Sequence, residues 1–398
     1  MINIERKADC CGCGACANAC PKKCIDMKAD EEGFLYPKIN SILCVHCGLC
    51  KKVCPEINVE PDTPKEQKGY LVQHKDEEIR LDSSAGGAFT AISEFVIEQG
   101  GVVFGAQYDE ELNVIHSYVE SEKELFKFRN SKYVQSDTKN TFSEAKDFLD
   151  EGRWVCFSGT PCQIEGLRTF LKKDYEKLVL VDVVCHAVPS PFVWNKYKDY
   201  IRSKYKDVMN IRFRDKYYGY RYSTMSVYCK NQEKPVYHEG IDTDFMLRAF
   251  FSDICDRPSC YECSFKKRYH VSDFTIWDCF IVSDLAKTLD DDKGTTRVLI
   301  QSQKANKIFD FIKNKLIVEE ISPDKLVENV KEMYHSVNMN PKRKEFFTDL
   351  NVLSEEEMIN KYFPNNIRAK CEKFVRVTMC KLGIYDNVKK LAKKVIKK

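Results

Sequence analysis

Two runs of four cysteines near the amino end have the residue type and the spacing to bind iron. The runs read Cys10-x2-Cys13-x2-Cys16-x3-Cys20-Pro21 and Cys44-x2-Cys47-x2-Cys50-x3-Cys54-Pro55. This spacing lets thiolates hold cubane [4Fe-4S] clusters, and in paired runs the fourth thiolate of each run crosses to the other cluster. We therefore predict one cluster on Cys10, Cys13, Cys16 and Cys54, and a second on Cys44, Cys47, Cys50 and Cys20.

Other uses of these cysteines fit less well. Disulfides belong to oxidising compartments, and residues 1–9 are polar, without the apolar segment of a secretory signal. Zinc sites commonly use Cys-x2-Cys pairs with a spacer instead of repeated runs of four. Cys11 and Cys24 lie outside the pattern, and we interpret both as buried or unused thiols. Because Cys11 directly follows Cys10, the register of the first ligand stays open by one residue.

Ten further cysteines occur after residue 155, among them the run Cys255-x4-Cys260-x2-Cys263. Such a run could supply three ligands of a third [4Fe-4S] cluster, with Cys185, Cys162 or Cys279 as the fourth. The hypothesis that we carry forward is a cluster on Cys185, Cys255, Cys260 and Cys263. Reduced structural thiols are an equally good interpretation of the same residues.

Two loops that open helices expose backbone N–H groups suited to an anion. The stretch DSSAGGAFT (82–90) is rich in small residues and precedes a helical pattern, although Gly-Gly also serves ordinary turns. The stretch RWVCFSGTPCQIEGL (153–167) reads as strand, tight turn and helix, where a phosphate or a flavin edge could dock. The buried strand LVLVDV ends in the polar turn VCHAVPSP, and ligands of open α/β sheets bind at such strand ends.

These groups must be positioned by at least two domains, since 398 residues are too many for a two-cluster module alone. We predict the α+β class: a small two-cluster ferredoxin-type domain (1–58), a linker (59–68), a larger mixed α/β domain (69–302) and a mostly helical extension (303–398) with a basic end. The small domain has little apolar core, so cluster ligation must supply much of its stability.

Charge and hydropathy narrow the classes of partner. The chain has 63 Lys and Arg against 60 Asp and Glu, so nucleic acid is not a favoured partner. No run approaches the 18 apolar residues of a membrane span, and we expect a cytoplasmic protein. The end, residues 385–398, reads as a basic amphipathic helix. It suits peripheral contact with the inner face of a membrane as well as it suits a solvated terminal helix.

Eight segments in order carry a resemblance to a known family: SSAGGAFTA, GAQYD, RNSKYVQS, FSGTPCQIEGL, VCHAVPSP, FRDK, RPSCYECSFK and SDFTI. Together with the two-cluster module they closely resemble the coenzyme F420 hydrogenase/dehydrogenase beta-subunit family over about residues 1–302. The resemblance implies an FAD-binding domain, clusters that feed the flavin, and hydride exchange with an organic acceptor. The acceptor is the deazaflavin coenzyme F420 in founding members; relatives use other substrates, and some accompany surface-polysaccharide genes.

The resemblance also implies a set of FAD contacts on three loops: Ser83, Ser84, Gly86, Gly87, Ser131, Lys132, Tyr133, Gly159, Thr160, Pro161 and Gln163. Lys132 would offset phosphate or flavin charge, or it is a solvated lysine. His186, beside Cys185, is a candidate proton donor to a reduced substrate, and a structural histidine is the alternative.

Three departures from the family bear on the substrate. Ala85 stands where the family has a third serine, Ala187 replaces a glycine, and residues 277–281 read Trp-Asp-Cys-Phe-Ile where Gly-Asp-Phe-Trp-Gly is usual. Bulky residues in place of two glycines change backbone freedom and pocket shape. Only Asp278 is retained there, so the substrate cannot be inferred from the family.

The leading hypothesis is an iron-sulfur flavoprotein oxidoreductase that moves electrons between a ferredoxin-type donor, or another redox protein, and a small-molecule hydride acceptor. Clusters pass single electrons while hydride chemistry needs two, and a flavin can connect the two. The alternative is a non-catalytic electron-transfer subunit that delivers to a partner enzyme. A third idea, motivated by the altered 277–281 stretch and the basic end, is a scaffold of a membrane-bound biosynthetic complex.

Overall fold

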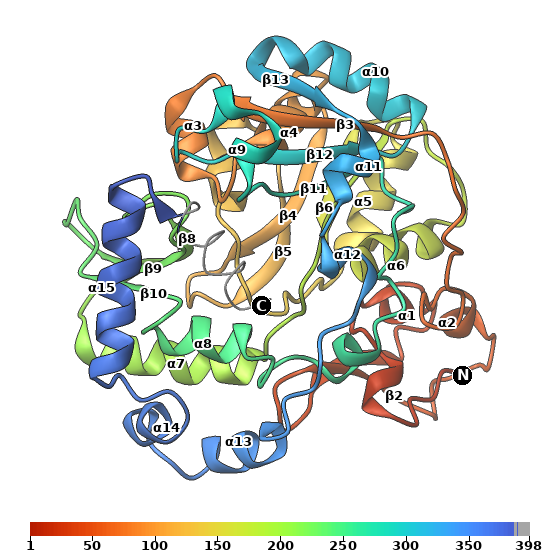
Figure 1. The fold of residues 1–398 in the computed structure, drawn as a ribbon. Helices are drawn as coiled ribbons and strands as arrows, with labels where there is room; N and C mark the ends of the chain where they lie inside the picture. Colours follow the sequence, from red (N-terminus) through yellow and green to blue (C-terminus); the bar gives the residue numbers. More distant parts are fainter. Residues whose placement is uncertain (386–387, 389–398) are drawn as a thin grey trace.

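The computed structural model describes residues 1–385 and 388 (Figure 1). Most of the predicted basic amphipathic helix over 385–398 therefore lies outside the described residues. None of the described helices has both the length and the apolar character that crossing a membrane requires.

The amino-terminal unit is built from very short elements around its cysteines, at the lower right of Figure 1. Two four-residue helices, α1 (Ala15–Asn18) and α2 (Leu49–Lys52), each follow a glycine in the left-handed conformation. Gly14 and Gly48 adopt φ of 79° and 76°, which only glycine reaches without strain. The hairpin of β1 (Ile25–Ala29) and β2 (Leu35–Ile39) joins the two loops, as the sequence indicated.

A mixed eight-stranded sheet forms the centre of the molecule, in the order β13-β3-β12-β11-β7-β6-β4-β5. Neighbouring strands from β4 to β11 through β6 and β7 are parallel, and the other pairs are antiparallel. The strands are β3 (Lys68–His74), β4 (Val102–Tyr108), β5 (Val114–Val119), β6 (Val155–Gly159), β7 (Leu178–Val183), β11 (Phe274–Asp278), β12 (Thr296–Ile300) and β13 (Leu316–Ile321). This sheet with its helices confirms the predicted α+β class.

Helices cover both faces of the sheet, and alternate residues of the central strands face each layer. Val179 and Val181 of β7 pack in the core with α4 (Ala88–Glu98) and α10 (Gln303–Ile312). Leu178 and Leu180 pack with α5 (Thr141–Asp150) and α6 (Pro161–Leu171). Because both faces are covered, the central strands are apolar throughout.

A second, three-stranded antiparallel sheet was not predicted. It consists of β8 (Val208–Asp215), β9 (Thr224–Cys229) and β10 (Tyr237–Gly240). Its core includes residues of α7 (Pro191–Lys204), α8 (Phe245–Phe251), α13 (Arg343–Leu350) and α14 (Glu355–Tyr362). The exposed helix α15 (Ile367–Lys381) follows, at the left of Figure 1.

Short helical segments connect these layers: α3 (Glu77–Asp82), α9 (Val282–Leu285), α11 (Pro323–Val327), α12 (Lys331–Tyr334), and the 3-10 turns η1 (Lys7–Asp9), η2 (Glu122–Phe128), η3 (Pro258–Glu262), η4 (Lys287–Leu289) and η5 (Lys313–Lys315).

The main sheet continues past residue 302, where the sequence predicted that the larger domain ends. Strand β13 pairs with β3 from Leu316 opposite His74 to Ile321 opposite Gly69. Without β13, the strand β3 would be an unpaired sheet edge, which proteins avoid. The predicted helical extension 303–398 therefore begins with elements that complete the central sheet.

Candidate redox site

A cavity of about 770 Å³ lies where the carboxyl ends of β6, β7 and β11 meet residues of β8 and α8. Parallel neighbours bring these strand ends to one edge of the sheet, the usual ligand position of such sheets. Most residues predicted to contact FAD line it: Ser83, Ser84, Gly87, Ser131, Lys132, Tyr133, Gly159, Thr160 and Gln163.

Two of the predicted residues do not line this cavity. Gly86 lies behind its loop, where a Cβ atom would come within 2.3 Å of the Val72 carbonyl oxygen and 2.7 Å of the Thr296 nitrogen. Glycine at this position therefore lets the loop pack directly on β3 and β12. Pro161 occupies the first turn of α6 and lines a smaller neighbouring cavity instead.

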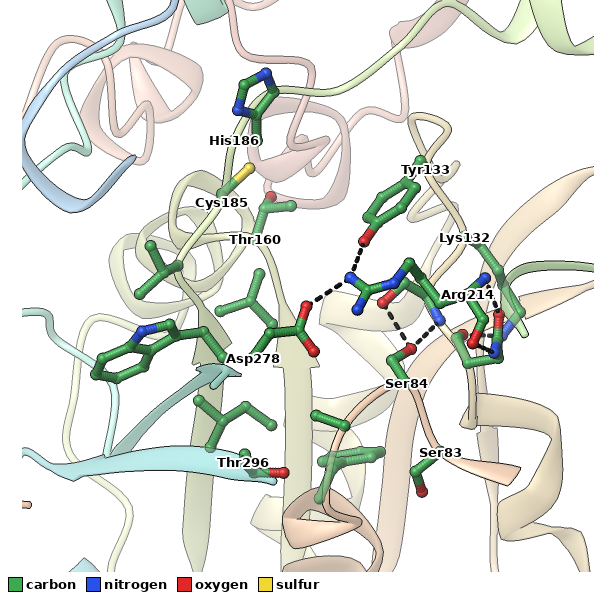
Figure 2. A pocket seen from close by; sticks show the side chains of 18 of the residues that line it. Ser83, Ser84, Lys132, Tyr133, Thr160, Cys185, His186, Arg214, Asp278 and Thr296 are labelled. Atoms are coloured by element: carbon green, nitrogen blue, oxygen red, sulfur yellow. Dashed lines mark hydrogen bonds and ion pairs between the residues drawn. The ribbon is translucent and has the colours of Figure 1, made fainter. Parts of the chain in front are cut away.

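The first two loops are hydrogen-bonded to each other. The Ser84 hydroxyl lies 2.9 Å from the Ser131 hydroxyl and accepts the Ser131 backbone N–H at 2.6 Å (Figure 2). Asp82 at the end of α3 pairs with Arg212 of β8 at 2.5 Å and with Arg129 at 3.4 Å. These contacts hold loops from distant parts of the sequence at the same cavity wall.

A buried polar network joins the third loop to the second. The Thr160 backbone N–H donates to the Gln163 side-chain oxygen at 3.0 Å, and the Gln163 amide donates to the Ser136 hydroxyl at 2.9 Å. Ser136 in turn lies 2.9 Å from His116 Nδ1, and His116 Nε2 lies 2.9 Å from the Ser158 carbonyl. Burial lowers the His116 pKa to about 4, so this imidazole is neutral at pH 7 and donates to Ser158.

Arg214 of β8 places a buried positive charge in the cavity. Its Nη1 donates to Asp278 at 2.6 Å and to the Tyr133 hydroxyl at 3.0 Å (Figure 2). Burial opposes the charged form, but Asp278 and the neighbouring tyrosines raise the Arg214 pKa well above its usual range. The second nitrogen, Nη2, is buried without a hydrogen-bond partner among the described residues. A permanently charged group with an unused donor is suited to an anionic or carbonyl-bearing ligand.

Lys132 is the other cation of the cavity wall. Its ammonium donates to the carbonyls of Arg129 and Asn130 at 3.1 and 3.2 Å. Burial, with a contribution from Arg212, lowers the Lys132 pKa to about 7. The predicted alternative of a fully solvated lysine is therefore wrong.

The eight cysteines of the amino-terminal runs form two groups in the folded chain. Cys20, Cys44, Cys47 and Cys50 line one small cavity, together with Cys24. In the other group, burial and the nearby thiols of Cys10 and Cys54 raise the Cys16 pKa to about 12. Cys13 is likewise influenced by Cys10 and Cys16. The structure thus brings together the two sets that the crossing pattern specified.

Neither group is arranged for a single metal ion. Zinc–sulfur bonds of about 2.3 Å in a tetrahedral site place the sulfurs about 3.8 Å apart. Among the described residues, no three cysteines have their sulfur atoms within 4.8 Å of one another. A cubane with four irons and four sulfides separates its thiolates further, so the donor set and its spacing fit [4Fe-4S] clusters.

A third group of thiols lies beside the main cavity, and it corrects the ligand set that the sequence suggested. Cys185, Cys260 and Cys263 line a second cavity together with Cys162 and Cys11. Cys255 is absent from this cavity, because it is fully buried in the core of the three-stranded sheet. The turn η3 carries Cys260 and Cys263 away from Cys255, and Cys162 at the start of α6 joins them instead.

The three cysteine groups and the main cavity are contiguous. Cys11, which the sequence suggested to be an unused thiol, lies close enough to Cys13 and Cys162 to interact with both. Cys11, Cys162 and Cys185 line the second cavity and also the main one. A chain of closely spaced sulfur sites therefore runs from the amino-terminal unit to the main cavity.

His186, the predicted proton donor, also lies at the wall of both cavities. Its Nε2 atom is 2.8 Å from Asp253 Oδ1, and its ring packs edge-on against Phe250. Its role as a proton donor stays a prediction.

Sequence reasoning missed the residues that close the site from the three-stranded sheet and its neighbours. Arg214 belongs to the segment FRDK, which entered only as part of the family resemblance. Arg257 is fully buried and donates to the carbonyls of Cys10 and Leu35 and to Gln135 at 2.7–2.9 Å. It anchors the amino-terminal unit to the rest of the molecule, and its position just before Cys260 was the only available signal.

Comparisons with known proteins agree with this arrangement. Residues 152–325 match the family described as the C terminus of the beta subunit of coenzyme F420 hydrogenase/dehydrogenase, and residues 9–57 match the 4Fe-4S dicluster domain. No curated protein matches the chain.

Among solved structures, the chain is similar to one from a xenon-derivatised F420-reducing [NiFe] hydrogenase complex of Methanosarcina barkeri. The TM-score is 0.44 with 15% identity, over 78% of this chain and 96% of that one. The two sequence matches and the site geometry lead to one conclusion: the chain belongs to the coenzyme F420 hydrogenase/dehydrogenase beta-subunit family and carries a two-cluster iron-sulfur domain at its amino end.

Proposed function

We propose that this protein binds FAD in the main cavity and exchanges electrons between its iron-sulfur clusters and an organic hydride acceptor. The observation that carries the proposal is the meeting of three loops, Ser83–Gly87, 129–136 and Gly159–Gln163, at one cavity whose wall also contains cysteines of the third group.

The cavity and its donors fit a flavin nucleotide. A volume of about 770 Å³ lies within the usual range of cofactor sites, and the lining combines apolar side chains with a few convergent polar groups. The N-terminus of α6, capped by Thr160 and started by Pro161, presents backbone N–H groups that attract phosphate. The unused Nη2 donor of Arg214 supplies a further place for an oxygen atom.

When bound, FAD supplies the step between one-electron and two-electron chemistry. The chain's own residues then have separate tasks. Lys132 in its protonated form offsets negative charge, and Arg214 holds its donor fixed because Asp278 and Tyr133 restrain the guanidinium. The neutral His116 and its partners keep the Thr160 loop in place without adding charge.

Electrons would reach the cavity through the sulfur sites. We assign the two clusters of the amino-terminal unit to Cys10, Cys13, Cys16 and Cys54, and to Cys20, Cys44, Cys47 and Cys50. A third cluster on Cys162, Cys185, Cys260 and Cys263 would lie between them and the flavin. A ferredoxin or another redox protein fits as the external donor or acceptor.

The acceptor is a small molecule, and coenzyme F420 is one candidate by family. Phe280 argues for a different pocket shape: it is 39% exposed and stacks on Tyr220, and the Arg214 guanidinium lies 4.9 Å from the centre of its ring. Such a bulky lining also supports a second candidate function, in which the chain passes electrons to a partner enzyme and binds no substrate itself.

Flavin content tests the proposal. Protein purified without oxygen should release about one FAD per chain, consistent with a single cofactor-sized cavity. Ser131→Trp should fill the cavity and abolish FAD binding while the iron content stays constant. Ser203→Trp, on the exposed side of α7, is the matched control and should keep its FAD.

Two outcomes contradict it. Wild-type protein with full iron content but no flavin would favour the electron-delivery function. Unchanged FAD in Ser131→Trp would move the flavin away from this cavity. Reoxidation of the reduced protein by a deazaflavin, by nicotinamides and by nucleotide sugars would then identify the acceptor.

A further inference from the structure

Three metal-ligand side chains converge where the segment after β7 meets the segment after α8. His186, Asp253 and Asp256 each place one ligand atom within 4.8 Å of the other two, and His186 Nε2 lies 2.8 Å from Asp253 Oδ1. Within the part of the chain that the structure describes, no other three His, Cys, Asp or Glu side chains come so close together.

Asp256 is the unusual member of this group. Its side chain has no exposed surface, and neither carboxylate oxygen has a hydrogen-bond partner among the described residues. A buried carboxylate without partners is strongly unfavourable, and buried charges are normally paired or bound to a metal. Asp256 therefore requires a positive charge or a proton that its protein surroundings do not supply.

The two nearest cationic side chains are committed elsewhere. Arg343 forms a forked pair with Glu32 at 2.8 and 2.5 Å, and it reaches Asp256 only through the backbone carbonyl. The Lys266 ammonium donates to the backbone carbonyls of Cys185, His186 and Glu332. Neither of them neutralises the Asp256 carboxylate directly.

The backbone holds the ligands of this group in place. The segments around Pro189 and Asp256 form an isolated antiparallel bridge. On either side of it, the Ser190 N–H donates to the Cys255 carbonyl at 2.9 Å, and the Arg257 N–H donates to the Val188 carbonyl at 3.0 Å. The two ligand-bearing segments are thus fixed against each other without the help of an ion.

We propose that His186, Asp253 and Asp256 bind a divalent transition-metal cation. One imidazole and two carboxylates suit Mn²⁺, Fe²⁺ or Zn²⁺, whereas Ca²⁺ and Mg²⁺ prefer oxygen ligands throughout. The two carboxylates balance the charge of the ion. Three protein ligands leave at least one coordination position open, and His186 and Asp253 are 26% and 23% exposed.

The site lies at the wall of the main cavity, because His186 lines it. A cation bound to Nε2 excludes the role of His186 as proton donor, since the ligand atom carries no proton. The competing explanation of the same geometry is a proton shared between Asp253 and Asp256.

Binding of Mn²⁺ to the cluster-loaded, anaerobic protein tests the proposal. Mn²⁺ suits carboxylate ligands and competes poorly for the thiolates that hold the clusters. After mild chelation that leaves the iron content unchanged, we expect one Mn²⁺ to bind per chain, measured by loss of the free Mn²⁺ signal in electron paramagnetic resonance. The bound ion should show spin-echo modulation from an imidazole nitrogen, and His186→Asn should abolish it.

Two further variants and a control complete the experiment. Asp256→Asn and the less buried Asp253→Asn should each weaken Mn²⁺ binding by more than about tenfold, since even outer partners of metal ligands have effects of that size. Asp310→Asn, at an exposed position on α10, should bind Mn²⁺ like the wild type. The iron content of each variant shows that it has folded.

Three results would overturn the proposal. The first is wild-type protein that binds no Mn²⁺ at millimolar concentration. The second is unchanged affinity in both aspartate variants. The third is an infrared band of a protonated carboxylic acid that persists with Mn²⁺ and disappears in Asp256→Asn, which would assign the shared proton instead.

Discussion

Single residues in the main cavity combine burial with charge, and this determines when they are charged. Arg214 keeps its charge because Asp278 lies 2.6 Å away. Lys132 has no carboxylate at hydrogen-bond distance among its described contacts, only carbonyls, so burial dominates and lowers its pKa to about 7. The two cations of one cavity therefore respond differently to pH: Arg214 provides a constant charge and Lys132 a variable one.

Lys132 predicts a pH dependence of FAD affinity. The protonated form, which prevails below pH 7, offsets negative charge, so affinity should fall as the pH rises from 6 to 8. Lys132→Met should flatten this dependence, and Lys132→Arg should keep high affinity at pH 8. Fluorescence titration of the apoprotein with FAD measures all three. The exposed control Lys123→Met should retain the wild-type profile, and a wild-type profile in Lys132→Met would contradict the assignment.

The same shift affects the stability of the protein without FAD. The folded pKa of about 7 lies below the ordinary value of 10.5, so between these pH values the unfolded chain binds more protons. The contribution of Lys132 to the free energy of unfolding therefore rises from pH 7 to pH 10.5, and its full unfavourable effect is present below pH 7.

At the scale of elements, helix α6 connects the two halves of the site. Its first turn borders the main cavity through Thr160 and Gln163, and its middle packs on the amino-terminal unit. A Cβ atom at Gly166 would come within 2.9 Å of Cys13 Sγ and 3.0 Å of Cys13 Cβ. Glycine here lets the helix approach the first cluster closely, which keeps the distance for electron transfer short.

Enlarging Gly166 should therefore disturb the first cluster. Gly166→Ala should destabilise the protein by about 1–3 kcal/mol, as overpacking usually does, and Gly166→Val should in addition lower the iron content. Thermal unfolding and iron analysis of anaerobic protein measure these effects. Arg168→Ala on the same helix, which loses only a pair with exposed Asp174, should match the wild type. Full iron content and unchanged stability in Gly166→Val would show that the helix can move aside.

At the scale of the whole molecule, the amino-terminal unit is held against the body by residues far along the chain. Arg257 reaches the Cys10 and Leu35 carbonyls, Thr138 donates to the Cys13 carbonyl at 3.0 Å, and Thr169 donates to the Val53 carbonyl at 2.7 Å. These contacts involve the backbone of the cluster loops themselves. The docking therefore fixes the order of sulfur sites between the unit and the main cavity.

Iron content reports on the third cluster. Three cubanes require about twelve iron atoms per chain and two require about eight. If Cys162 is a ligand, Cys162→Ala should lower the iron content from about twelve to about eight. Cys255→Ala is the matched control, because this buried cysteine lies outside the thiol-lined cavity, and its iron content should not change. About eight iron atoms in the wild type would refute the third cluster.

The sequence by itself determined the features that depend on near neighbours. The cysteine spacings of the two runs, the hairpin between them, and the strand-turn-helix at 153–167 all involve residues a few positions apart, where local geometry is sufficient. The central strands were recognisable because both of their faces are buried and their side chains are apolar throughout. The three loops came from the family resemblance, and most of their residues do line one cavity.

Only the tertiary structure decided which distant residues meet. Cys162 and Cys260 share a cavity although they are far apart in the sequence, and the neighbouring Cys255 faces a different core. The three-stranded sheet brings Arg214 to Asp278, and β13 joins the main sheet from beyond the predicted boundary. Such encounters follow from how sheets and helices pack over long separations, which no local spacing encodes.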